Sequence, residues 1–216
     1  MGAFPAPLVI SYGNGLGVTL EPQKPLRLST MAWDFPERPD LIALATLSQR
    51  LDFLRDHLKS LCGLWDKLPR LFLDVYFRDI AECIGRNRSA LDALSAAHGG
   101  LFRPEDWSYA ALCPLPQARL PAAPEAPVDF VFWTGEELYA VEIASAASES
   151  RHRRDNRARL RKSGISLIEL AGTGLASGRP GDLASRLPAD LREFWRSDAL
   201  PSSPFRVGSL DEILPA

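Results

Sequence analysis

Cysteine, histidine and methionine are scarce in this chain of 216 residues, which contains three, three and two of them respectively. The cysteines, Cys62, Cys83 and Cys113, form no C-x-x-C pair and stand in no cysteine–histidine pattern. Neither a disulfide framework nor a zinc site is therefore indicated. We expect three small buried side chains in a reducing compartment.

Long hydrophobic runs are also lacking. No stretch approaches the ~20 apolar residues of a membrane span, and the N-terminus has neither the basic nor the apolar region of a signal peptide. We therefore expect a soluble cytoplasmic protein with no membrane partner. A content of 46% hydrophobic and 24% charged residues indicates a globular chain, and 216 residues suffice for one unit with a substantial core.

Net charge is low as well, at −2 from 25 basic and 27 acidic residues. Taken alone, this value argues against binding to nucleic acid through overall charge. The charge is unevenly distributed, however. Residues 151–162 hold seven basic side chains against one acid, a local charge of +6, which leaves −8 on the other 204 residues. The whole-chain value therefore does not exclude a phosphate backbone as a partner.

The first hundred residues divide into two segments. Residues 1–39 are an N-terminal β hairpin segment, because apolar runs at 8–10 and 18–20 flank the turn signal Gly13-Asn14-Gly15. Residues 40–100 are a helical segment that packs on the core. Apolar side chains recur there at steps of three and four over 47–65, which is typical of an amphipathic helix facing a core or, alternatively, a dimer seam.

Two further helices are predicted in this helical segment. The first covers residues 71–84, with Pro69 as the break before it. The second begins at Ser89, with Asp92 completing a pair that resembles a capping box, and it ends at the glycine pair 99–100.

Residues 101–175 are predicted to form an α/β core. A strand or strand pair lies within 107–120, a Pro/Ala-rich loop follows at 121–127, and two β-rich runs at 128–133 and 138–143 form a hairpin. A polar helix at 148–163 and an apolar strand at 165–170 complete the core, and this last connection favours a parallel crossover. Residues 172–174 are interpreted as a turn, and residues 176–216 as a tail with one short helix. Together the four segments predict one globular α/β unit with a mixed central sheet.

Two acids interrupt the apolar strands of the predicted hairpin. Asp129 lies near the start of the first strand and Glu142 near the end of the second. A carboxylate in a core strand needs a partner, a metal ion or a path to solvent. On adjacent antiparallel strands the two side chains can converge, and paired carboxylates suit a hard cation such as Mg²⁺ or Mn²⁺. Taken singly, each acid can instead be a strand-end or edge residue that reaches water.

The basic helix follows directly after this hairpin. Its candidate nucleic-acid-binding residues are Arg151, Arg153, Arg154, Arg157, Arg161 and Lys162. At ~100° per residue, four of these arginines fall within about a third of the helix circumference. Arginine suits phosphate geometry, so the helix can be a phosphate-contacting face. It can equally pair with the acidic remainder of the chain, and both interpretations remain open at this point.

These motifs resemble the PD-(D/E)XK, or restriction-endonuclease-like, nuclease superfamily over about residues 105–170. The likeness is closer to its very-short-patch-repair endonuclease-like branch, in which an Arg/Asp-rich helix ends in Leu-x-x-x-Gly, as Leu160 and Gly164 do here. The resemblance implies a restriction-endonuclease-like core, with Asp129 and Glu142 as the catalytic, metal-binding acids of a phosphodiesterase.

The sequence departs from the superfamily pattern at the lysine. That position, two residues after Glu142, is Ala144, and residues 145–150 lack the glycine and histidine of the repair-like branch. Arg151, Arg153 or Lys162 could replace the lysine from the following helix. His152 and Glu82 are possible auxiliary residues, Glu82 because some members use a helical acid before the sheet.

Three functional hypotheses follow. The first is a Mg²⁺-dependent nuclease acting on DNA phosphodiester bonds, in which the metal would activate a water molecule. The second is a catalytically degenerate copy of the same fold that binds nucleic acid or a protein partner. The third is an assembly protein whose 47–65 helix forms the interface and whose basic helix docks on the chain's own acidic surface.

Overall fold

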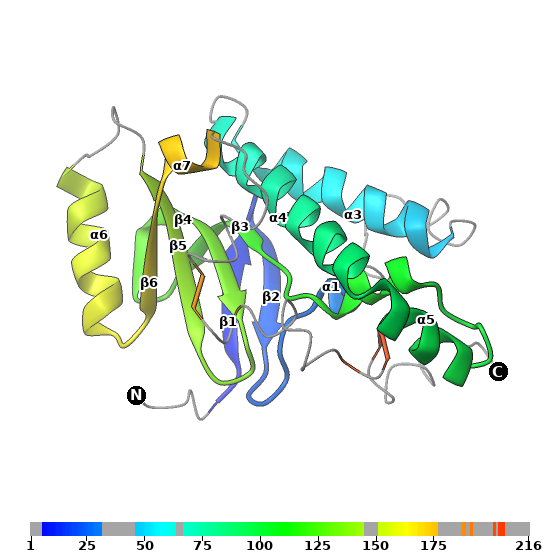
Figure 1. The fold of residues 1–216 in the computed structure, drawn as a ribbon. Helices are drawn as coiled ribbons and strands as arrows, with labels where there is room; N and C mark the ends of the chain where they lie inside the picture. The colour runs from blue at the N-terminus through cyan, green and yellow to red at the C-terminus, as the bar shows by residue number, and fades with distance from the viewer. Residues whose placement is uncertain are drawn as a thin grey trace.

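The computed structural model describes residues 6–31, 46–63, 67–144 and 151–176, together with 187, 188, 191, 201 and 203–205. Six strands form one mixed sheet in the order β2-β1-β3-β4-β5-β6, and helices lie on both of its faces (Figure 1). This arrangement confirms the predicted α/β class with a mixed central sheet. In chain order the elements are β1 (Leu8–Tyr12), β2 (Leu16–Leu20), α1 (Leu28–Met31), α3 (Leu47–Leu61), α4 (Lys67–Arg86), α5 (Arg88–Ala97), the 3-10 helix η1 (Pro104–Ala110), β3 (Leu115–Leu120), β4 (Ala123–Trp133), β5 (Leu138–Ala144), α6 (Arg151–Lys162), β6 (Ser166–Ala171) and α7 (Gly172–Ala176).

The N-terminal hairpin is confirmed. Leu8 pairs with Leu20 and Tyr12 with Leu16 in an antiparallel ladder. Gly13 and Gly15, which flank Asn14 in the turn, have φ values of 54° and 95°. Glycine adopts such left-handed angles without a steric penalty, so these residues allow the tight reversal between the strands.

The centre of the sheet is the predicted β-rich core. Strand β4 pairs antiparallel with both β3 and β5, whereas β6 pairs parallel with β5. A parallel neighbour requires a crossover connection, and α6 supplies it. The predicted hairpin, the polar helix and the parallel last strand are therefore all present.

Helix α4 covers one face of the sheet. The ring of Phe72 stacks on Phe130 of β4 with centroids 4.5 Å apart, and Tyr76 contacts Phe132 at 5.6 Å. Side chains alternate along a strand, so Phe130 and Phe132 share the α4 face and Asp129 points to the opposite one. Helix α3, capped by the Thr46 hydroxyl, packs beside α4. Helix α6 lies across the sheet from them (Figure 1).

Two boundaries in the helical segment differ from prediction. Pro69 lies inside the first turn of α4, which begins at Lys67. Amide groups of a first turn have no intrahelical acceptor, so proline is tolerated there and does not separate the helices. Helix α5 begins at Arg88 with Asn87 as its N-cap, and Asp92 pairs with Arg88 at 3.3 Å. The expected capping box at Ser89 is therefore wrong.

The strand predicted within 107–120 is β3, and the 3-10 helix η1 precedes it. Two assignments in the core change. The Pro/Ala-rich segment 121–127 is mostly strand, because Ala123 of β4 already pairs with Leu120. Proline lacks the amide donor of a ladder but is compatible with extended backbone where that donor is not needed. Residues 172–174 begin the short helix α7 instead of forming a turn.

All three cysteines are buried, as predicted. Among the described residues, no helix combines the length and the apolar character that crossing a membrane demands. The short helix predicted within the 176–216 tail falls largely outside the described residues, as does the segment 145–150.

Candidate functional site

Asp129 and Glu142 lie side by side on β4 and β5. The ladder pairs Phe130 with Val141, and continuing that register by one residue places Asp129 opposite Glu142. Both acids point away from α4, because side chains alternate along each strand. Both are buried, with exposed fractions of 4% and 3%. The structure thus brings together the two acids that the sequence singled out.

A third acid extends this pair across the sheet. Glu169 of β6 is the parallel partner of Glu142 and occupies the same face. We call Asp129, Glu142 and Glu169 the acid row. Sequence reasoning missed Glu169, although the signal was the same as for the other two: one acid within the apolar run 165–170.

Three arginines of helix α6 lie over the acid row and form ion pairs with it. Arg153, Arg157 and Arg161 are spaced by four residues and therefore share one face of the helix; we call them the arginine row. The ion pairs, in order of position, are Arg153 Nη2 to Asp129 Oδ1 at 3.8 Å, Arg157 Nε to Glu142 Oε2 at 2.5 Å, Arg157 Nη1 to Glu169 Oε2 at 3.3 Å and Arg161 Nη2 to Glu169 Oε1 at 2.6 Å.

Solvent exposure changes along the two rows. The Arg157–Glu142 pair is enclosed, with side chains 13% and 4% exposed, whereas the Arg161–Glu169 pair is 63% and 40% exposed. At the enclosed end of the two rows, Asp129 and Arg153 also form hydrogen bonds with the backbone of β5. The Ile143 amide donates to Asp129 Oδ2 at 2.7 Å, and Arg153 Nη1 donates to the Ile143 carbonyl at 3.5 Å.

Apolar and backbone contacts hold α6 in this orientation. Leu160 is fully buried against the sheet, and Asn156 Nδ2 donates to the Ala126 carbonyl at 3.4 Å. At the end of the helix, Gly164 has a φ of 76° and the Ile165 amide donates to the Leu160 carbonyl at 3.1 Å. The Leu-x-x-x-Gly motif is thus a helix C-terminal cap that turns the chain into β6.

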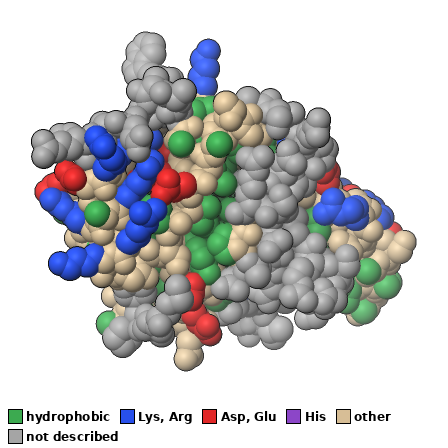
Figure 2. All heavy atoms as spheres, turned by 60° about the vertical axis from the view of Figure 1, so that its left-hand side comes forward, with side chains coloured by type: hydrophobic (Ala, Val, Ile, Leu, Met, Phe, Trp, Pro, Cys, Tyr) green, Lys and Arg blue, Asp and Glu red, His purple; other side chains and the backbone are tan. Residues whose placement is uncertain are grey.

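Three further basic side chains of α6, those of Arg154, Arg159 and Lys162, are exposed. Arg159 pairs with Glu125 at 2.9 Å, whereas Arg154 and Lys162 are exposed and make no ion pair within the described part of the chain. Figure 2 shows basic side chains gathered over this side of the molecule with fewer acidic ones among them. The helix contains Arg151 and His152, whose side chains lie outside the described part of the structure.

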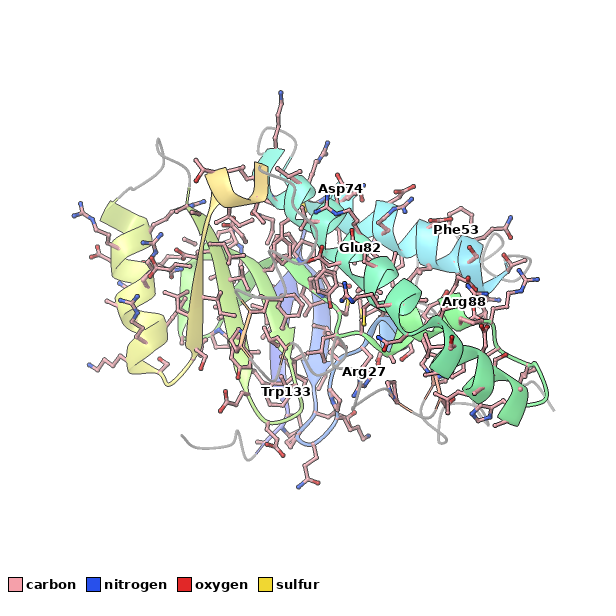
Figure 3. The ribbon with its side chains drawn as sticks, in the orientation of Figure 1. Arg27, Phe53, Asp74, Glu82, Arg88 and Trp133 are labelled. Carbon is pink, nitrogen blue, oxygen red and sulfur yellow. The ribbon has the colours of Figure 1, made fainter. Side chains whose placement is uncertain are left out.

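Two other residues considered from sequence behave differently. Glu82 belongs to α4, on the far side of the sheet from α6 (Figure 3), and its carboxylate lies 3.9 Å from Arg78. It therefore does not join the acid row. Ala144 ends β5 at an exposed position, so the position at which the resemblance would place a lysine carries no amino group.

The acid row, as arranged, does not fit a resident Mg²⁺ ion. Among the described residues, no group of three or more His, Cys, Asp or Glu side chains could hold a metal ion. Mg²⁺ usually retains several water molecules, and the nearly complete burial of Asp129 and Glu142 leaves them little access to water. Their negative charge is already balanced by arginines.

Comparison with known proteins returns no relative from which a role could be transferred. No protein-family model matches the chain, and neither does any curated protein or solved structure.

Proposed function

We propose that this chain is a catalytically degenerate, nuclease-like module that binds nucleic acid, DNA in preference, through the outward side of α6. The order of hairpin, helix and parallel strand, with one acid on each hairpin strand, supports the nuclease-like core. The alanine at position 144 and the pairing of both acids with arginines support loss of cleavage.

One observation carries the binding proposal: α6 uses its basic side chains in two different ways. The arginine row is directed at the acid row, whereas Arg154, Arg161 and Lys162 leave positive charge at the exposed surface. Arg161 contributes to both, since it pairs with Glu169 while remaining 63% exposed. A solvent-facing basic flank on a helix suits contacts with a phosphate backbone.

Binding is tested by fluorescence anisotropy with labelled duplex and single-stranded DNA over a range of salt concentrations. Arg154→Ala and Lys162→Ala are each expected to weaken binding and to lower the slope of log K against log salt by about 1. Arg88→Ala is the matched control, because it removes the same charge from α5, away from α6 (Figure 3). Equal losses in all three variants, or no binding by the native chain, would contradict the proposal.

Cleavage is tested separately, with plasmid, linear and single-stranded DNA in Mg²⁺ or Mn²⁺. No product is expected from the native chain. If the native chain cuts and Glu142→Gln does not, the chain is an active metal-dependent nuclease instead of a degenerate one. The binding and cleavage assays therefore judge the two halves of the proposal independently.

A further inference from the structure

The enclosed part of the acid row, Asp129 and Glu142, places two carboxylates side by side in the protein interior. Asp129 and Glu142 are 4% and 3% exposed, and the carbonyl of the buried residue Ile143 faces the same helix, because it accepts from Arg153 Nη1. Two carboxylates without a counter-charge would be strongly unfavourable in such surroundings. Something positively charged must therefore occupy the space facing them.

Guanidinium groups from α6 supply that charge. Arg157 Nε lies 2.5 Å from Glu142, Arg153 Nη2 lies 3.8 Å from Asp129, and Arg153 Nη1 donates to the Ile143 carbonyl at 3.5 Å. Carboxylate and carbonyl oxygens are the ligands that hard divalent cations take in proteins. Here the same kinds of oxygen face arginine nitrogens, whose planar fork suits carboxylates.

We propose that the oxygens of Asp129, Glu142 and Ile143 form an internal cation site that the chain fills with its own Arg153 and Arg157. The folded chain then takes up no divalent cation at this position. Removing the Arg157 side chain leaves two adjacent carboxylates with reduced charge compensation and turns the position into a divalent-cation site. This proposal goes beyond nucleic-acid binding, which uses the outward side of the same helix.

The arginines compete with dissolved cations for these oxygens, and they have the advantage of belonging to the same chain. Leu160 and the Asn156 amide hold α6 against the sheet, so the guanidinium groups meet the carboxylates within one molecule. A dissolved ion would have to displace a partner that is already tethered in place. It would also have to shed water in order to enter a site this deeply buried.

The experiment measures Mn²⁺ binding by isothermal titration calorimetry and the melting temperature across a MnCl₂ titration. For the native chain, we expect the same response as for Glu142→Gln, which lacks one of the carboxylates. For Arg157→Gln, we expect saturable binding and a melting temperature that rises by roughly 5–10 °C at a hundredfold excess over Kd. Adding Glu142→Gln to that variant should remove the gain.

Arg161→Gln is the matched control, because it removes the same charge from the exposed end of the arginine row. An equal gain in Arg161→Gln overturns the proposal. So does native binding of Mn²⁺ that Glu142→Gln abolishes.

If Arg157→Gln is unfolded in metal-free buffer, recovery of its helical circular dichroism signal on adding Mn²⁺ is the readout. Recovery that also requires Glu142 supports the proposal. If Mn²⁺ restores nothing and a folded Arg153→Gln variant gains no binding, the proposal is wrong.

Discussion

Replacing Arg157 by alanine tests the energetic role of the arginine row. The side chain is 13% exposed and neutralises Glu142, which is 4% exposed, as well as Glu169. Removing one partner of a buried pair leaves an uncompensated charge and costs about 3–5 kcal/mol. In a chain of this size each kcal/mol lowers the melting temperature by about 2–4 °C, so we expect a drop of roughly 6–20 °C.

Urea unfolding followed by circular dichroism gives the free energy of unfolding directly. The control is Arg55→Ala, which removes an exposed partner of Asp52 (38% and 55% exposed) and should cost no more than about 1 kcal/mol. The double variant Arg157→Leu/Glu142→Leu replaces the pair by apolar side chains and should recover most of the loss. The reasoning is refuted if Arg157→Ala costs as little as Arg55→Ala, or if the double variant is no more stable than Arg157→Ala.

Three further outcomes are expected. A Cβ at Gly172 would lie 2.9 Å from Leu68 and 3.0 Å from a backbone carbonyl, so Gly172→Ala should lower the free energy of unfolding by about 1–3 kcal/mol. Gly85→Ala is the control: it lies in open space within α4 and should raise the free energy of unfolding by about 0.5–1 kcal/mol. If the two variants behave alike in urea unfolding, Gly172 is not closely packed. All three cysteines are buried, and burial also raises the pKa of the Cys113 thiol. The three thiols should therefore react with a reagent such as DTNB only after denaturation, and a thiol that reacts in native buffer contradicts this burial. Burial raises the pKa of the Asp106 carboxyl above 3.8, although the Arg103 amide donates to this carboxylate. The native state therefore holds the proton more tightly than the unfolded chain does, so the stability from this group is present in acid and declines as pH rises from 3.8 through the raised pKa. Asp106→Asn should remove that decline from urea titrations made across this pH range, and an unchanged series would refute the assignment.

Much of the core could be predicted because its signals are local. The 128–133 and 138–143 runs contain enough β-branched and aromatic residues to indicate a hairpin, and the hairpin brings Asp129 next to Glu142. The Pro/Ala-rich segment 121–127 is a different case, because a high proline content is typical of a loop but is also compatible with a strand. Its backbone is extended and continues directly into β4, which proline permits.

The pairing of α6 could not be predicted, for a different reason. The spacing of Arg153, Arg157 and Arg161 places them on one face of the helix, but spacing does not tell whether that face meets solvent or sheet. Leu160 and Asn156, the only α6 residues with described side chains that are buried, decide this orientation. A single large apolar residue, Leu160, in a helix this polar is too weak a signal to fix an orientation from sequence.

The acid row also bears on the order in which the sheet can assemble. Its three members come from β4, β5 and β6, so three like charges approach one another as the strands pair, and they remain uncompensated until α6 covers them. Strand β6 and α6 are consecutive in the chain and should dock as one cooperative unit after the β4–β5 hairpin. If the ion pairs form only after the rate-limiting step, weakening them accelerates unfolding and leaves the folding rate nearly unchanged. The same arginines that balance charge in the finished fold would then set how long it persists.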